Sequence, residues 1–432
     1  RAKPELTVQI TDAAVKANPK DAYGIVREAV KGNPKATLDI IKTVIKTNPS
    51  STSAIATAAS DANPKAALEI TQSAIQANPV ATSEIVKGVV TSQHGLVLEI
   101  TKVAIQTNPA AVAAITKAAV NADIWDMGHG NTWEKNAGGF QSANITIAAI
   151  QASPSSATEI FKAAIQGLNH NRGGIVTLSV AELTSAVTKA NPTKAVEITL
   201  GGMSERPNDM SIISAAIKAN PKLALEITKA AIQANPSLTT QISAAAIKAN
   251  PSQAAEITKV NSGTTGTTGT YTITNMVEAI KANPSATEQI VSSVIKGSRE
   301  NAIADIVNMA IKANPSAAVA IASTAIRTYP NLFVDITKSA IQANQKQAAA
   351  ITTAMINSVP NQSAVITEVA VAVATSVITV ENGLTYIRTA STTEAKAKAA
   401  KLAEEVTVAA LKAAPSNSVA ITQSAIKAAP SF

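Results

Sequence analysis

The sequence predicts an all-α protein built as an α-solenoid of short helical repeats. Isoleucine recurs every 15 residues, Asn-Pro recurs in the same phase, and a slower 30-residue period lies underneath. A fixed internal period is the signature of a repeat array, in which each unit contacts only its neighbours. The isoleucines of the first stretch are Ile10, Ile25, Ile40, Ile55, Ile70, Ile85, Ile100 and Ile115.

Each Asn-Pro pair predicts the start of one helix. Asparagine is a favoured N-cap because its side-chain oxygen accepts hydrogen bonds from unpaired backbone N–H groups. Proline suits the first helical position and cannot continue the helix before it. We therefore expect one helix of about 12–13 residues, roughly 19 Å long, per repeat. The pairs of the first stretch begin at Asn18, Asn33, Asn48, Asn63, Asn78 and Asn108.

Alternate helices differ in a way that predicts two layers. Leucine stands two residues before the isoleucine at Leu38, Leu68 and Leu98, which are 30 residues apart. The intervening helices carry Ser53, Ser83 and Ala113 at that position. Odd and even helices therefore occupy different environments, and the simplest geometry is a 30-residue helix pair stacked into a two-layer solenoid.

Several stretches interrupt the repeat and are expected to form inserted loops on a single elongated body spanning 1–432. Insertions in repeat arrays usually lie on the surface, where they can carry function. The last stretch precedes a longer helix, from about Glu394 to Lys412, that has no Asn-Pro break. The expected loops are 122–143, 167–175, 200–209, 261–272 and 381–393.

No stretch carries a convincing catalytic, cofactor-binding or metal-binding motif. Asp126, His129 and Glu134 could gather a metal, but they lack a recognised ligand spacing. The Gly/Thr-rich stretch 261–272 lacks the Gly-Lys-Ser/Thr ending of a phosphate-binding loop. His94 stands where proline usually stands, which indicates a degenerate helix start. The sequence has no cysteine, and no serine lies in a nucleophile motif, so we expect no enzymatic activity, no cofactor and no metal.

Trp125, Trp133 and Phe140 all fall in the stretch 122–143. They have two interpretations. They could form a local mini-core that lets the chain fold where helical repeats lapse. They could also form a contact patch for another chain, because tryptophan is enriched at interface hot spots.

Composition narrows the class of partner. The net charge is +8, but the excess lysine comes mostly from one position at the helix ends, where the helix dipole favours a cation. Aromatic residues are 2% of the chain, so few side chains could stack on bases, and we expect no nucleic-acid binding. No apolar run reaches the roughly 18 residues of a transmembrane helix. Asn144 and Asn361 lie in glycosylation-type Asn-x-Ser/Thr sequences.

The two ends of the sequence carry ordinary repeats with no obvious polar cap, and only 15% of the residues are charged. Exposed ends of a repeat core tend to associate, and a head-to-tail contact that does not close makes a fibre. We therefore expect a non-enzymatic structural protein that self-assembles, as a subunit of an extracellular filament, sheath or surface layer. The partners would be copies of the chain, with another surface protein as a further option. The candidate interface residues are Trp125, Trp133, Phe140, Tyr271, Ile421, Ile426 and Phe432.

A second hypothesis is a monomeric α-solenoid scaffold that binds a protein or peptide on its concave face. Light scattering distinguishes the two hypotheses, since a polymer scatters as large particles and a scaffold does not. We expect an extracellular or cell-surface location, while a cytoplasmic location stays open because a cysteine-free chain suits both.

Overall fold

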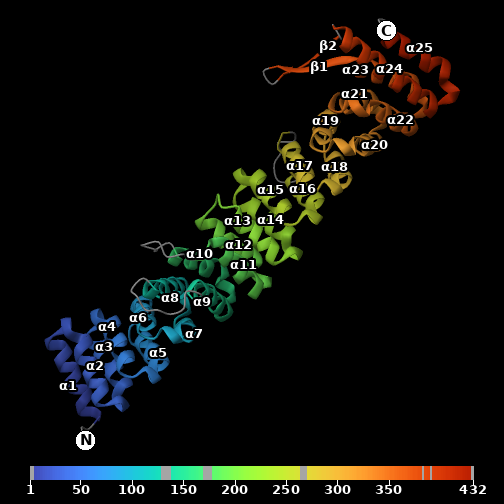
Figure 1. Ribbon diagram of the computed structural model, residues 1–432. Coiled ribbons are helices and arrows are strands. Elements are labelled where there is room, and N and C mark those ends of the chain that lie inside the picture. The colour runs from blue at the N-terminus through green and yellow to red at the C-terminus, as the bar shows by residue number, and fades with distance from the viewer. Residues whose placement is uncertain are drawn as a thin grey trace. The chain divides into compact units, whose positions relative to one another are not determined.

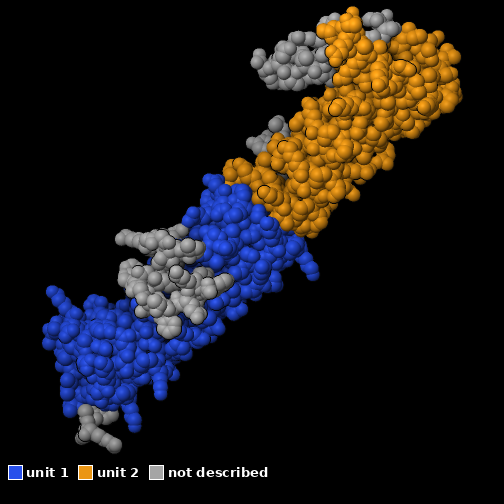
Figure 2. Space-filling model, viewed as in Figure 1, with its two compact units in different colours: residues 1–235 blue, residues 236–432 orange. Residues whose placement is uncertain are grey.

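A computed structural model describes residues 4–127, 138–168, 178–262, 270–381, 384–389 and 392–429. Most of the described residues are helical, which confirms the all-α repeat solenoid. The contacts divide the chain into two compact units, residues 1–235 and 236–432, which Figure 2 colours separately.

Both units are built from helices that follow one another along the chain, as labelled in Figure 1. In unit 1 they are α1 (Pro4–Ala17), α2 (Ala22–Gly32), α3 (Thr37–Thr47), α4 (Thr52–Ala62), α5 (Ala67–Ala77), α6 (Thr82–Ser92), α7 (Val97–Thr107), α8 (Val112–Met127), α9 (Gly138–Ala152), α10 (Ala157–Leu168), α11 (Val180–Ala190), α12 (Ala195–Glu205), α13 (Ser211–Ala219) and α14 (Ala224–Ala234).

In unit 2 the elements are α15 (Thr239–Ala249), α16 (Ala254–Ser262), α17 (Thr270–Ala282), α18 (Thr287–Lys296), α19 (Ile303–Ala313), α20 (Ala318–Thr328), α21 (Phe333–Ala343), α22 (Ala348–Ser358), α23 (Ser363–Ala374), β1 (Ser376–Glu381), β2 (Leu384–Thr389), α24 (Thr393–Ala413) and α25 (Ser418–Ala428). The helix α24 is the longer, unbroken helix expected after the last interruption.

One repeat consists of a linking residue, a three-residue 3₁₀ turn and an eleven-residue α-helix, which together give the 15-residue period. Asn63, for example, links α4 to the turn Pro64–Ala66, and α5 follows. Proline therefore opens the 3₁₀ turn, and the α-helix begins three residues after it rather than at the proline itself, which is the start that the sequence predicts. His94 likewise opens the turn before α7, as expected for a degenerate helix start.

The repeated asparagine does not cap its own helix, so the N-cap prediction is wrong. At Asn78 the side chain accepts no capping bond, and its Nδ2 lies 2.9 Å from Thr52 Oγ1 and 3.2 Å from the carbonyl oxygen of Pro49. Thr52 Oγ1 donates to the same carbonyl at 2.6 Å. We call this pattern the amide ladder, since each amide reaches back two helices. It recurs at Asn33, Asn63, Asn108, Asn220, Asn283, Asn314 and Asn344.

The helices of each unit form the two layers that the 30-residue period predicts. Each odd-numbered helix packs against the next odd one, and each even-numbered helix against the next even one; α3 contacts α5, and α4 contacts α6. The repeated isoleucines face the core between these helices, where Ile40, Ile70 and Ile100 are fully buried. Alanines such as Ala74 and Ala104 complete the seam and let the helices approach closely.

Helix continues into the expected loops 122–143, 167–175, 200–209 and 261–272. The helices α8 and α9 extend into 122–143, which leaves residues 128–137 outside the described part, and α10 extends to Leu168. The helix α12 runs through Gly201 and Gly202 to Glu205, so most of 200–209 is not a loop. The glycines accommodate a close neighbour: a Cβ on Gly201 would lie 2.5 Å from the carbonyl oxygen of Thr158 on α10. A Cβ on Gly202 would lie 3.2 Å from the ring of Phe161.

The expected loop 381–393 is largely a β-hairpin, which is a further correction. The strands β1 and β2 pair antiparallel from Ser376 opposite Thr389 to Glu381 opposite Leu384. In Figure 1 the two arrows extend away from α23 and α24. The signal was available in the sequence, because Asn382-Gly383 between two β-branched segments is a strong hairpin signature. The stretch 261–272 stays an interruption between α16 and α17, and residues 263–269 lie outside the described part.

Candidate interaction surfaces

The candidate interface residues lie in different parts of the structure. Ile421 and Ile426 both belong to α25, but Ile421 is fully buried whereas Ile426 is 66% exposed. Ile421 packs inside the repeat, so only Ile426 is available to another chain. Trp125 belongs to α8, Phe140 to α9 and Tyr271 to α17, and their side chains lie outside the described part. Trp133 and Phe432 lie wholly outside it, as do His129 and Glu134.

The first described helix exposes apolar side chains at core positions of the repeat. Leu6 and Ile10 of α1 are 51% and 60% exposed. Thirty residues later, their counterparts Ala36 and Ile40 are fully buried. The difference arises because α3 packs between α1 and α5, whereas, among the described residues, α1 contacts a helix of its own layer only in α3. We call Leu6 and Ile10 the leading surface.

The helix α25 also exposes apolar side chains that other repeats bury, but on a different side of the repeat from Leu6 and Ile10. Val419 and Ile426 are 71% and 66% exposed, and Thr422 is also exposed. At the matching positions of α5, Thr71 and Ile75 are buried against the next helix of the layer. We call Val419, Thr422 and Ile426 the trailing surface. The candidate interface residues predicted from the sequence include Ile426 but not Leu6 or Ile10, although the unbroken isoleucine phase marks Ile10 as a core position.

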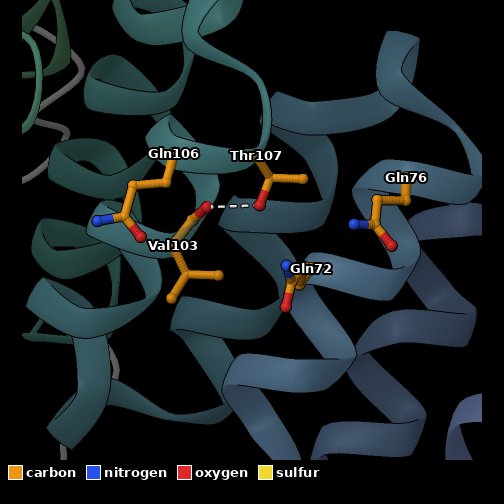
Figure 3. Close-up of a pocket in the computed structure, with 5 residues that line it drawn as sticks. All are labelled: Gln72, Gln76, Val103, Gln106 and Thr107. Atoms are coloured by element: carbon orange, nitrogen blue, oxygen red, sulfur yellow. Dashed lines mark hydrogen bonds between the residues drawn. The ribbon is translucent and has the colours of Figure 1, made fainter.

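A shallow polar groove lies between α5 and α7 in unit 1 (Figure 3). Its volume is about 290 Å³. Thr107 Oγ1 is turned to the carbonyl oxygen of Val103, to which it donates at 2.7 Å. The glutamine amides can donate and accept hydrogen bonds, but the lining holds no titratable side chain and so offers no acid–base chemistry. The lining residues are Gln72, Gln76, Val103, Gln106 and Thr107.

A larger groove of about 620 Å³ lies between α22 and α24 in unit 2. Its lining combines alternating charges on α24 with small or apolar side chains, among them Val408, which is 41% exposed. Such a lining suits an extended or helical peptide better than a small substrate. The lining residues are Ala349, Thr353, Lys401, Glu404, Glu405, Val408, Ala409 and Lys412.

Carboxylates connect helices within a layer. Asp61 at the end of α4 accepts hydrogen bonds from Tyr23 Oη of α2 and Ser92 Oγ of α6. The bond to Asp61, together with partial burial, raises the pKa of Tyr23 above its ordinary value. Asp12 of α1 accepts from Thr47 of α3 and from Lys16 at 2.6 Å. Burial opposes the effect of these partners, but their hydrogen bonds and the Lys16 charge leave the pKa of Asp12 lowered.

Asp61 and Asp12 connect neighbouring helices through these hydrogen bonds. Within the described residues, no three histidine, cysteine or acidic side chains gather to hold a metal. The described helices also include none that is both long and apolar enough to cross a membrane.

Comparison with known proteins adds no relative. No model of a known protein family matches the chain, and no curated protein shows significant sequence similarity to it. The class is therefore defined by the fold itself, as an all-α helical-repeat solenoid.

Proposed function

We propose that the chain is a non-enzymatic structural protein that self-assembles, with the leading surface of one copy packing against the trailing surface of another. The observation that carries the proposal is the exposure of Ile10 and Ile426. Ile10 is 60% exposed and Ile426 is 66% exposed, whereas Ile40 and Ile75 at matching repeat positions are 0% and 1% exposed. In other repeats a neighbouring helix covers these positions, so an exposed isoleucine there favours contact with a helix of the same kind.

The contact would be heterologous, because the leading and trailing surfaces are different. A heterologous contact produces a ring when its rotation closes and a filament when it does not. Only 15% of the residues are charged, so a contact between copies has few charges to desolvate, but the net charge of +8 adds a repulsion that the contact must overcome. These features support a filament, sheath or surface-layer subunit, and with it an extracellular or cell-surface location.

The free energy of this contact can be compared with the cost of bringing two copies together. Burying a fully exposed large apolar side chain contributes about 1.5–3 kcal/mol. The apolar side chains of the two surfaces are 51–71% exposed, so together they contribute roughly 4–7 kcal/mol; they are Leu6, Ile10, Val419 and Ile426. Association costs an estimated 4–15 kcal/mol in lost translational and rotational freedom. The leading and trailing surfaces are therefore marginal by themselves, and a stable polymer needs an additional contact between copies.

The test compares particle mass by light scattering and analytical ultracentrifugation for the wild type, Ile10→Asp and Ile426→Asp. We expect large particles for the wild type and a strong loss of mass for both variants, with unchanged helicity because both side chains are exposed. Val80→Asp is the matched control, since Val80 is 94% exposed in the turn before α6 and belongs to neither surface. A wild type that stays monomeric at high concentration would overturn the proposal.

The second candidate function is a scaffold that binds a peptide, and the groove between α22 and α24 favours it. With a volume of about 620 Å³ and both Lys401 and Glu404 in its lining, the groove could hold a segment with charges of both signs. A monomeric wild type that binds such peptides, and loses binding on Val408→Asp, would favour the scaffold over the filament.

A further inference from the structure

The β-hairpin stands apart from the other described elements, which are helical. In the described structure the sheet has two strands, so β1 and β2 each have one edge without a strand partner. Two-stranded hairpins are marginal alone, and an open edge presents a row of backbone donors and acceptors to another strand. Nothing in the 15-residue repeat requires such an element.

The hairpin is anchored at its base by a residue that breaks the repeat. Gln345 stands after Asn344 where proline stands in most repeats. Its Nε2 donates to the carbonyl oxygens of Val373 at 3.0 Å and Ser376 at 2.8 Å. The first bond holds the end of α23, and the second holds the start of β1. The hairpin is therefore fixed to the helical body at one end.

The pairing register shows which backbone groups point outward. Glu381 and Leu384 flank a two-residue connection, and the pair that flanks such a connection normally exchanges both hydrogen bonds. Alternate residues of β1, namely Ser376, Ile378 and Val380, then direct their N–H and C=O groups to the open edge. The bond from Gln345 to the Ser376 carbonyl agrees with this alternation.

The two edges differ in how well their sequences resist pairing. Natural proteins protect edge strands with charges, prolines and bulges. The strand β1 is Ser-Val-Ile-Thr-Val-Glu, with its single charge at the end, and its six pairs with β2 run without a bulge. The strand β2 carries Arg388 within its length. The edge of β1 is therefore the less protected one.

We propose that the open edge of β1 pairs antiparallel with the β1 edge of a second copy, giving a four-stranded sheet. Pairing centred on Thr379 sets Ile378 of each strand opposite Val380 of the other, so that the outward groups meet. The same register places the two Glu381 residues at opposite ends, and therefore no like charges lie face to face. This inference rests on the proposed self-assembly and supplies the additional contact that the leading and trailing surfaces require.

The experiment uses the full chain and substitutes proline on one edge at a time. Ile378→Pro removes an outward N–H of β1 and leaves the bonds within the hairpin in place. Ile387→Pro makes the same change on the β2 edge and is the matched control. We expect Ile378→Pro to lose the high-mass particles, while Ile387→Pro keeps them. Ile378→Lys, which retains the N–H group, should act like Ile378→Pro, and Ile387→Lys should not.

Amide hydrogen exchange gives an independent readout. In assembled wild type the amides of Ile378 and Val380 should be protected, and they should exchange rapidly when the polymer is dissociated. A wild type that assembles while both proline variants keep its particle mass would overturn the hairpin contact alone. Loss of mass only in Ile387→Pro would overturn the choice of edge. A wild type that never assembles would overturn the proposed function and this inference together.

Discussion

At the scale of single residues, the repeated asparagine acts between helices. Its backbone joins two elements, and its side-chain amide bonds a helix start that lies two helices earlier, as Asn78 does with Thr52 and Pro49. A hydrogen bond within a protein contributes about 0.5–1.5 kcal/mol, and leaving a buried partner such as Thr52 unsatisfied costs more. The amide ladder therefore fixes the spacing of successive helices within a layer.

Replacing Asn78 by alanine should lower the free energy of unfolding by about 1–3 kcal/mol, because Pro49 and Thr52 each lose a donor. Chemical denaturation measures the change. A double-mutant cycle with Thr52→Ala should show coupling of at least about 0.5 kcal/mol, since the two side chains are in contact. Lys102→Gln, on the exposed face of α7, is the control and should stay within about 0.5 kcal/mol. If the unfolding free-energy changes of the two single variants simply added up in the double variant, the amide ladder would be contradicted.

At the scale of elements, small residues decide where helices can approach. The helix α12 packs against α10 through Gly201 and Gly202, beside the fully buried Phe161. The pair of glycines looks like a loop signal in the sequence, but it is the condition for this close packing.

Gly201→Ala should destabilise the protein by about 1–3 kcal/mol, because the new methyl group overlaps the Thr158 carbonyl. Gly32→Ala at the end of α2 is the matched control, since a Cβ there has no atom within 4 Å. That control should be neutral or stabilise by about 0.4–1 kcal/mol, as alanine restricts the unfolded chain. Thermal unfolding of both variants tests the contrast, and equal effects would rule out the packing argument.

Asp61 links three even-numbered helices, and the Tyr23 pKa reports on that link. Because the hydrogen bond to Asp61 raises the pKa of Tyr23, its contribution to stability is complete below the ordinary tyrosine value of about 10. The contribution is lost as the pH rises through the raised pKa of the folded protein. Asp61→Asn should return the Tyr23 pKa toward its ordinary value, as measured by NMR titration of ring-labelled tyrosine. Tyr23→Phe assigns the signal. An unchanged titration in Asp61→Asn would show that the link is absent in solution.

At the scale of the whole molecule, each helix depends on near neighbours in its own stack. Ile70 and Ile10 occupy the same repeat position, but Ile70 is 0% exposed and Ile10 is 60% exposed. A repeat array transmits a defect mainly to adjacent units, because its stability is close to a sum of neighbour terms.

Ile70→Asp should therefore cost several kcal/mol, since it places a charge in an apolar seam. Hydrogen exchange should show lost protection in α3 to α7 and retained protection in unit 2. Ile10→Asp should change the melting temperature little, because its side chain already faces solvent. If the two variants melted alike, the assignment of buried and exposed positions would be wrong.

Much of the fold could be predicted from the sequence, whereas much of the candidate site could not. The isoleucine phase correctly identified Ile40 and Ile70 as core, and the 30-residue alternation correctly gave two layers. Ile421 was expected at an interface and is buried. A periodic pattern shows that a position faces the stack, but it does not show whether a neighbour covers that position.

The sequence by itself determined the helical repeat, its length and its two layers, because these follow from local preferences repeated at a fixed period. Proline restricts backbone angles in any context, and the isoleucine spacing puts an apolar stripe on every helix. Only the tertiary structure decided the partner of each asparagine amide, the close contact at Gly201, and the exposure of Ile10 and Ile426. Each of these depends on whether groups about 26 to 30 residues or more away in the chain pack against the residue, and no local pattern encodes where such groups meet.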